Sequence, residues 1–146
     1  MVYLDSSSLL KLLWPEPESA AVRAGVAAED VVIVSSLAEL ESEVQLKAAW
    51  VAGRYQAARW RRFREKLAEF RETEPFRFHR LSTPVFDVAL RQHRAGGKTH
   101  CRTLDRLHLA AMEELNVRRL MTNDLSQTAA ARAMGLEVLT PGVISA

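Results

Sequence analysis

The chain has 146 residues, of which 48% are hydrophobic and 26% are charged, and its formal net charge is +2. This composition predicts one globular domain over residues 1–146 and excludes an intrinsically disordered chain. The single cysteine, Cys101, excludes an intramolecular disulfide. There is no run of about 18 apolar residues and no secretory signal, so we expect a complete cytoplasmic protein without a membrane span.

Charge is distributed unevenly along the chain. Residues 1–53 contain three Lys/Arg and eight Asp/Glu, a balance of −5, whereas residues 54–80 contain nine and four, a balance of +5. Residues 81–146 contain eight and six, a balance of +2. An acidic first third beside a basic middle predicts a focused acidic site with a basic surface nearby.

Apolar, β-branched runs predict strands, and longer segments with helical periodicity or strong helix formers predict helices. In chain order, the first half is expected to form a strand at 2–4, helices at 6–14 and 18–28, a strand at 31–35, and helices at 36–52 and 54–72. The second half is expected to form a strand at 76–81, helices at 83–95 and 103–116, a strand at 117–122, a helix at 126–135 and a strand at 136–140.

Strands that alternate with helices predict an α/β fold with a mostly parallel central sheet and helices on both faces. In such folds, sites lie at the carboxyl ends of the strands. Asp5 and Asp124 both fall just past a predicted strand end. Each is also well suited to be the N-cap of the helix that follows, and this alternative stays open for both residues.

The predicted buried face of the helix at 36–52 consists of apolar residues: Leu37, Leu40, Val44 and Ala48. Glu41 lies on this same face, whereas Glu39 lies on the opposite, solvated side. A carboxylate that faces a core is costly unless it is paired or bound to a metal. The alternative is that Glu41 sits at the edge of the apolar stripe and reaches solvent or an arginine.

Asp105 lies in the first turn of the helix at 103–116, where the helix dipole alone favours a negative charge. His108 follows one turn later in the same helix. A lone histidine in this position is more often a packed, hydrogen-bonded side chain than a ligand. Neither residue is assigned a role by its local pattern.

Taken together, the four acids Asp5, Glu41, Asp105 and Asp124 are expected to converge at one end of the sheet. Carboxylates packed together raise their own pKa values, and a bound divalent cation removes that penalty. Oxygen ligands suit Mg²⁺ or Mn²⁺, and no Cys/His spacing resembles a zinc site.

Four segments carry these acids and cover most of the chain: "YLDSSSLLKL", "VVIVSSLAELESEVQL", "TLDRLHLAAM" and "LMTNDLSQTAAARAMGLEVLTP". In this order and spacing they resemble the PIN-domain nucleases, and most closely the VapC-like toxins of bacterial toxin–antitoxin pairs. The resemblance implies a three-layer α/β/α sandwich and a metal-dependent endoribonuclease.

The resemblance also implies roles for single residues. The catalytic, metal-binding acids are Asp5, Glu41, Asp105 and Asp124, with Ser6 and Thr122 as supporting polar residues. We hypothesise that Asp5, Asp105 and Asp124 hold the main ion, while Glu41 binds a second ion or orients the attacking water. The alternatives are a non-catalytic PIN-like module that binds RNA or protein, and a phosphatase that uses Asp5 as its nucleophile.

Basic residues are expected to guide RNA towards an acidic pocket. The segment "RYQAARWRRFREK" supplies Arg59, Arg61 and Arg62 beside aromatic residues, and Arg102 belongs to a second basic cluster. Arginines contact phosphates, and aromatic rings stack on unpaired bases. The alternative for the aromatic residues is a core stripe, which consists of Trp60, Phe63, Leu67 and Phe70.

The resemblance further implies a small antitoxin partner and a homodimer. The apolar segment "SLLKLLW" at 8–14 is compatible with a partner surface because it is too apolar to be wet on all sides. The alternative is a helix that is fully buried within the chain.

Overall fold

A computed structural model describes residues 1–143, which form a five-stranded sheet with the strand order β3-β2-β1-β4-β5. The strands are β1 (Val2–Leu4), β2 (Val32–Ser35), β3 (Phe76–His79), β4 (Arg119–Met121) and β5 (Glu137–Leu139). Every neighbouring pair is parallel, with Tyr3 of β1 level with Ile33 of β2 and Leu120 of β4. All carboxyl ends of the strands therefore point to the same edge of the sheet.

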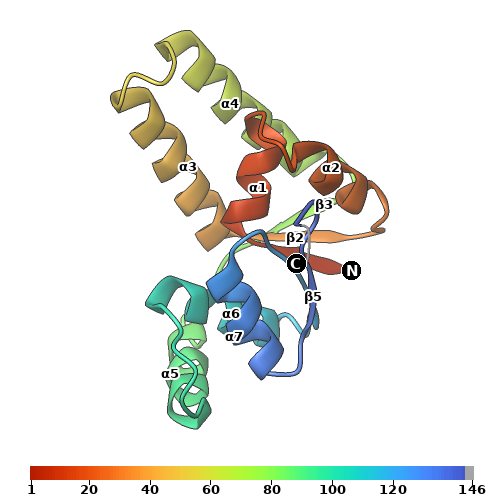
Figure 1. Cartoon of the computed structure of the whole chain (residues 1–146), viewed down its shortest axis with the longest axis vertical. Helices are drawn as coiled ribbons and strands as arrows, with labels where there is room; N and C mark the ends of the chain where they lie inside the picture. Colours follow the sequence, from red (N-terminus) through yellow and green to blue (C-terminus); the bar gives the residue numbers. More distant parts are fainter. Residues whose placement is uncertain (144–146) are drawn as a thin grey trace.

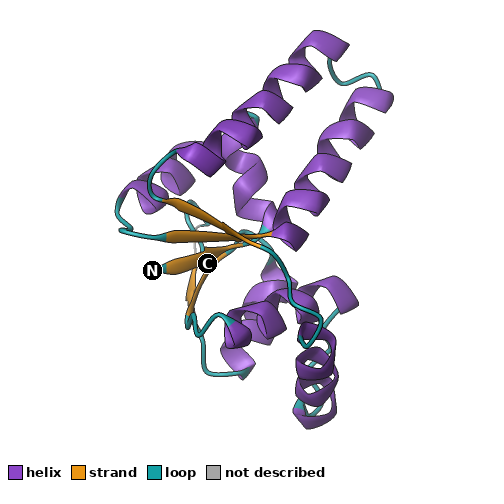
Figure 2. Ribbon diagram, turned by 180° about the vertical axis from the view of Figure 1, so that it is seen from behind, coloured by secondary structure: helices purple, strands orange, loops and turns teal. Residues whose placement is uncertain are grey.

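Helices cover both faces of this sheet (Figures 1 and 2). Those of one layer are α1 (Ser6–Leu13), α2 (Ser19–Ala27), α3 (Ser36–Val51) and α4 (Ala57–Glu69), and those of the other are α5 (Val85–Ala95), α6 (Thr103–Glu114) and α7 (Leu125–Ala133). A short 3-10 turn, Phe70–Glu72, follows α4. The predicted α/β/α architecture is confirmed, and each predicted strand and helix is present among the described residues with small shifts at its ends.

The core has two halves because alternate side chains of a strand point to opposite faces. Val2 and Leu4 of β1 pack into the cluster below α1–α4, whereas Tyr3 packs into the cluster below α5–α7. Both sets are buried, as expected for a central parallel strand covered by helices on both sides.

The predicted buried face of α3 is confirmed only at Leu37, and Ala48 is exposed. Leu40 and Val44 are 62% and 55% exposed, and the residues that face the core are Leu37, Ala38, Ser42, Leu46 and Ala49. Small residues at 38, 42 and 49 let α3 pack beside α1 and α4, so the bulkier stripe turns outward. Glu41 is therefore not part of a buried face with Leu40 and Val44. It lies one helical turn after the buried Leu37.

The apolar helix α1 is an internal element. Leu9, Leu12 and Leu13 are buried, and Leu10 and Trp14 pack against the same core cluster below α2, α3 and α4. Most of this segment is therefore buried within the chain, whereas Leu10, Lys11 and Trp14 stay partly exposed. In α4, Phe63 and Leu67 are buried with Trp60 and Phe70 against them, as the core-stripe alternative predicts. No helix among residues 1–143 is long and apolar enough to cross a bilayer.

Candidate active site

Several strand-to-helix junctions meet at the carboxyl edge of the sheet. Asp5 follows β1 and caps α1, Ser35 ends β2 and caps α3, and Asp124 follows β4 and caps α7. Asp105 lies in the first turn of α6. Because the strands are parallel, these junctions lie at one edge, and their polar side chains gather there.

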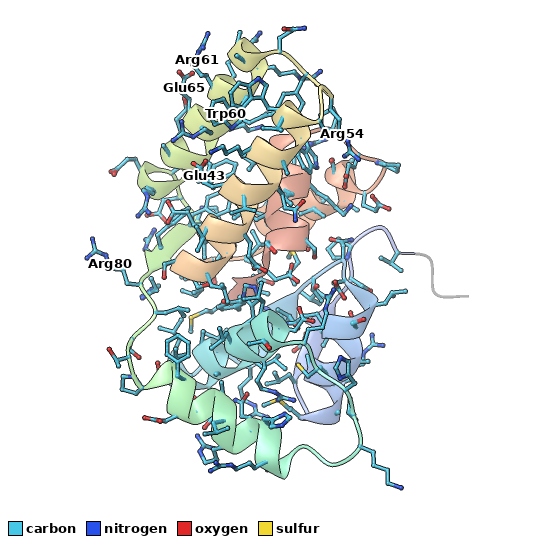
Figure 3. All side chains as sticks on the ribbon, turned by 90° about the vertical axis from the view of Figure 1, so that its left-hand side faces the viewer. Glu43, Arg54, Trp60, Arg61, Glu65 and Arg80 are labelled. Atoms are coloured by element: carbon cyan, nitrogen blue, oxygen red, sulfur yellow. The ribbon has the colours of Figure 1, made fainter. Side chains whose placement is uncertain are left out.

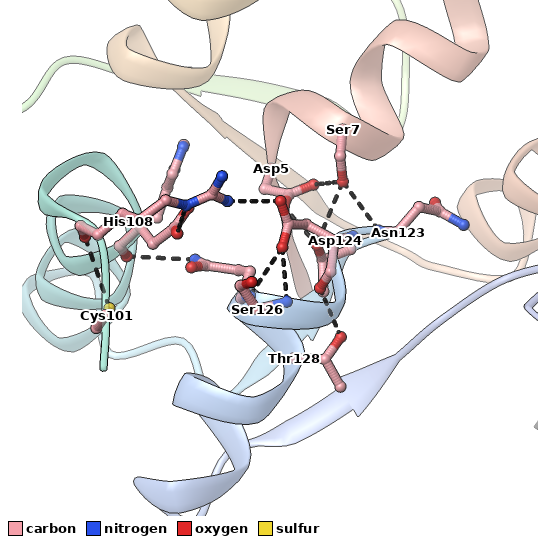
Figure 4. A network of polar contacts seen from close by, with 12 residues as sticks. Asp5, Ser7, Cys101, His108, Asn123, Asp124, Ser126 and Thr128 are labelled. Atoms are coloured by element: carbon pink, nitrogen blue, oxygen red, sulfur yellow. Dashed lines mark hydrogen bonds and ion pairs between the residues drawn. The ribbon is translucent and has the colours of Figure 1, made fainter. Parts of the chain in front are cut away.

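Asp5 and Asp124 are joined through Thr122. The Asp5 carboxylate accepts hydrogen bonds from the Ser8 backbone N–H at 3.1 Å, from the Ser7 hydroxyl at 2.7 Å and from the Thr122 hydroxyl. The same Thr122 Oγ1 accepts a hydrogen bond from the backbone N–H of Asp124 at 3.0 Å. Figure 4 shows Asp5, Ser7 and Asp124 within this network. These hydrogen bonds connect the carboxyl ends of β1 and β4.

Burial dominates the electrostatics of Asp5, whose residue surface is only 4% exposed. Loss of hydration raises the pKa of its carboxyl above the ordinary value, although the hydrogen bonds from Thr122, Ser7 and Ser8 oppose the shift. Asp5 is therefore both the cap of α1 and a buried acid whose ionisation is disfavoured, and a positive charge placed nearby would stabilise its ionised form.

Arg102 forms a bridge between Asp105 and Asp124. Its Nε lies 2.6 Å from Asp105 Oδ2, and its Nη2 lies 2.6 Å from Asp124 Oδ2. These bonds raise the pKa of the Arg102 guanidinium, that to Asp105 contributing most. Partial burial raises the pKa of Asp124, but the N–H of Gln127 and the Arg102 guanidinium outweigh it, so the net shift is downward.

Glu41 is brought to the same edge from α3. Its Oε2 lies 2.6 Å from Nε2 of His108, a buried residue of α6. Glu39, which lies two residues earlier in α3, instead forms an ion pair with Arg71. His108 is packed and hydrogen-bonded, as its local pattern predicts, and its partner is one of the acids singled out from the sequence.

Residues 2–140 match the sequence profile of the PIN domain, which is nearly the whole described chain. The chain belongs to the PIN-domain family. A curated relative, ribonuclease VapC46 of Mycobacterium tuberculosis, is 32% identical over 144 residues, with 96% of this chain and 97% of the relative covered. This PIN domain is therefore a VapC-like member of the family.

Solved PIN-domain structures share its fold. VapC20 of Mycobacterium tuberculosis, described as a toxin that cleaves the sarcin–ricin loop, superposes with a TM-score of 0.70 at 15% identity over 89% of this chain and 95% of that one. VapBC2 of Rickettsia felis, bound to a DNA fragment from its promoter, gives a TM-score of 0.67 at 13% identity over 95% and 98%. At these identities, the likeness concerns the fold.

The donor set of this PIN domain suits a hard divalent cation, because Asp5, Glu41, Asp105 and Asp124 all offer carboxylate oxygens. The described residues nevertheless hold no group of three or more His, Cys, Asp or Glu side chains placed to share one ion. Arg102 supplies positive charge between Asp105 and Asp124, and His108 holds Glu41. The residues fit the ion chemically, and Arg102 must leave its bridge before these acids can share it.

The other predicted polar residues of the PIN domain are placed differently. The Ser6 side chain makes no hydrogen bond within residues 1–143, and its neighbour Ser7 contacts Asp5 instead. The sequence did not single out Ser7, because three serines follow Asp5 and only the geometry of α1 decides which hydroxyl reaches the Asp5 carboxylate. Arg59, Arg61 and Arg62 lie on α4, away from the carboxyl edge, whereas Arg102 lies at it.

Thr122→Val is expected to destabilise the PIN domain by about 1–3 kcal/mol, because Asp5 loses a donor and the Asp124 N–H loses its acceptor in a buried site. Urea unfolding of the metal-free protein measures this change. Thr122→Ser keeps the hydroxyl and loses one methyl group, which costs about 0.8 kcal/mol. A valine variant as stable as the wild type would show that the Thr122 bridge contributes nothing.

Proposed function

We propose that this PIN-domain protein is a metal-dependent endoribonuclease and the toxin of a toxin–antitoxin pair. The observation that carries the proposal is the meeting of Asp5, Glu41, Asp105 and Asp124 at one edge of the sheet in a chain that is 32% identical to a ribonuclease. These acids come from four separate helices or helix caps, and an edge with so much negative charge is suited to Mg²⁺ or Mn²⁺.

Each acid has a distinct part in this proposal. Asp5, Asp105 and Asp124 hold the main ion, and Glu41 holds a second ion or orients the attacking water. A divalent ion in such a site lowers the pKa of water and offsets charge on the phosphate. Thr122 and Ser7 keep the Asp5 carboxylate in one orientation through their hydroxyls. Arg102, once displaced from its bridge, is placed to contact an RNA phosphate.

Incubation of the purified protein with structured and single-stranded RNA tests the activity. Cleavage is expected with Mg²⁺ or Mn²⁺, none with EDTA, and activity returns when Mn²⁺ is added back. Absence of cleavage with either ion would favour the alternative of a non-catalytic RNA- or protein-binding module. Sequencing of cut ends after induced expression would identify the RNA and its cleavage site.

The basic part of α4 is proposed to bind RNA at a distance from the cleavage site. The helix α3 is about 24 Å long, and it leads away from the sheet to a turn from which α4 returns. Arg54, Trp60 and Arg61 lie at the far end of this hairpin (Figure 3). An RNA strand that reaches both regions would span several nucleotides.

Arg61→Gln is expected to weaken RNA binding and to leave the cleavage rate of bound RNA unchanged, because Arg61 is remote from the acids. For single-stranded RNA, the logarithm of the binding constant decreases linearly with the logarithm of the salt concentration. Loss of one phosphate contact should make this slope less steep by about 0.7. Fluorescence anisotropy of labelled RNA, with EDTA present, measures the binding constant at each salt concentration. Arg23→Gln on α2 is the charge-matched control, and an equal change in both variants would refute a specific contact.

The antitoxin and the homodimer are proposed because a VapC-like relative, VapBC2, was solved as a complex. Large apolar side chains are exposed on both helical layers: Leu40, Val44 and Val51 on α3, and Phe86, Leu90 and Leu104 on α5 and α6. Co-purification with the product of a neighbouring gene tests the antitoxin. Light scattering tests the dimer, and a monomer at high concentration would reject it.

A further inference from the structure

A line of hydrogen bonds runs from the buried centre of the sheet to Glu41. The Tyr3 hydroxyl lies 2.6 Å from Ser35 Oγ and 2.8 Å from Nδ1 of His108. On the other side of the imidazole, Nε2 lies 2.6 Å from Glu41 Oε2. Tyr3 and Ser35 are fully buried, His108 is nearly so, and Glu41 is the member of the line closest to solvent.

The chemistry of the end groups assigns the protons along this line. An ionised carboxylate only accepts hydrogen bonds, so the 2.6 Å contact with Glu41 requires a proton on His108 Nε2. In a neutral imidazole, Nδ1 is then the acceptor, and the Tyr3 hydroxyl must donate to it. The Tyr3 oxygen in turn accepts from the Ser35 hydroxyl, and each hydroxyl donates once.

The opposite tautomer is disfavoured by the same distances. It would place the Nε2 lone pair against the carboxylate of Glu41 at 2.6 Å, where two acceptors repel. The ring cannot easily turn away, because it packs edge-on against Tyr3 with centroids 5.7 Å apart and an interplanar angle of 75°. Burial also raises the pKa of the Tyr3 hydroxyl, which keeps it protonated as a donor.

We propose that His108, held as its Nε2–H tautomer by Tyr3, is a positioning residue that orients the Glu41 carboxylate. One oxygen, Oε2, is fixed by His108, and the other stays available at the carboxyl edge of the sheet. The role of Glu41 in cleavage rests on the proposed function, whereas the tautomer and its hydrogen bonds follow from the geometry alone. His108 acts through Glu41 and does not touch RNA.

Nitrogen-15 NMR of labelled histidine tests the assignment without any metal or RNA. When the imidazole is neutral, the His108 spectrum should show a protonated Nε2 and an unprotonated Nδ1. Tyr3→Phe should shift the Nδ1 resonance of His108 and leave those of His79, His93 and His100 unchanged. A protonated Nδ1 in the wild type, or no shift in the variant, would overturn the proposal.

Two substitutions at position 108 test the effect on Glu41. Loss of a group that orients a ligand typically costs about 10- to 100-fold in metal affinity or activity, and His108→Met is expected to lose that much with an unchanged KM for RNA. His108→Gln retains an N–H near the position of Nε2 and should recover most of the loss. Thermal melting checks that both variants fold, and Mn²⁺ binding is measured by electron paramagnetic resonance in the absence of RNA.

The outcomes separate the two proposals. Equal losses in His108→Gln and His108→Met, or a loss in neither, would overturn the positioning role of His108. A wild-type protein that neither binds Mn²⁺ nor cleaves RNA would refute the proposed nuclease, and the NMR result would still decide whether Tyr3 and His108 orient Glu41.

Discussion

Asp5→Asn is expected to abolish RNA cleavage while the fold survives. Asparagine caps a helix about as well as aspartate, so the Ser8 N–H keeps its acceptor and α1 stays anchored. The variant loses the carboxylate that is proposed to hold the ion. Loss of a residue that only orients a metal ligand lowers metal affinity or activity by about 10- to 100-fold. Removal of a direct ligand should therefore lower the initial cleavage rate with Mn²⁺ by more than about 100-fold.

Two controls separate a ligand from a cap. Asp87→Asn removes an exposed acid in the first turn of α5 and should leave cleavage unchanged. Asp5→Ala should lose cleavage and also about 1 kcal/mol of stability, because alanine cannot cap α1. Full cleavage by Asp5→Asn would show that Asp5 is a cap alone, and the proposed metal site would lose its most buried member.

The same variant has an expected effect on stability. Burial raises the pKa of Asp5, so the folded state holds its proton more tightly than the unfolded state does. Stability of the metal-free wild type therefore falls as pH rises from the ordinary aspartate range through the raised pKa. Asp5→Asn lacks this titration, so its advantage in melting temperature over the wild type should grow across that window. An advantage that shrinks with pH would contradict the raised pKa.

Arg102→Gln is expected to change two affinities in opposite directions. In the metal-free protein, the guanidinium bridges Asp105 and Asp124, and a divalent ion shared by these acids must displace it. Each exposed ion pair contributes at most about 1 kcal/mol, and 56% of the Arg102 side chain is exposed. The two pairs therefore contribute at most about 2 kcal/mol together, and Mn²⁺ affinity should rise by up to about 30-fold. RNA binding should weaken because a phosphate-contacting charge is lost.

Arg94→Gln is the matched control for this prediction. Arg94 is an exposed residue in the last turn of α5, and its side chain forms no ion pair among residues 1–143. Titration with Mn²⁺ alone, followed by RNA titration of each variant in EDTA, measures the two effects separately. Unchanged Mn²⁺ affinity in Arg102→Gln would mean that the bridge does not compete with the ion.

Local patterns were sufficient for the order of elements in this chain. Short β-branched runs such as residues 31–35 and helix signals such as those at 103–116 depend on neighbouring residues, and the elements appear where these patterns predict them. Position was also predictable for Asp5 and Asp124, because parallel strands bring their carboxyl ends to one edge.

The exposed face of α3 shows where local patterns failed. Leu40 and Val44 have the periodicity of a buried stripe, yet the buried residues of α3, which packs beside α1 and α4, include the small Ala38, Ser42 and Ala49. A helix surrounded on several sides can bury more than one face, and the choice depends on the size and position of its neighbours. The sequence pointed to Glu41 on a wrong premise. Its contact with His108 forms where α3 and α6, which cover opposite faces of the sheet, both reach the carboxyl edge.

The sequence by itself determined the alternation of strands and helices and the position of Asp5 and Asp124 at the carboxyl edge of the sheet, because both follow from short-range patterns and from the geometry of parallel strands. Only the tertiary structure decided that Ser7 contacts Asp5, that Arg102 bridges Asp105 and Asp124, and that Tyr3 and His108 hold Glu41. These contacts join residues from different elements, many of them far apart along the chain. Their hydrogen bonds require distances of about 3 Å that no local pattern encodes.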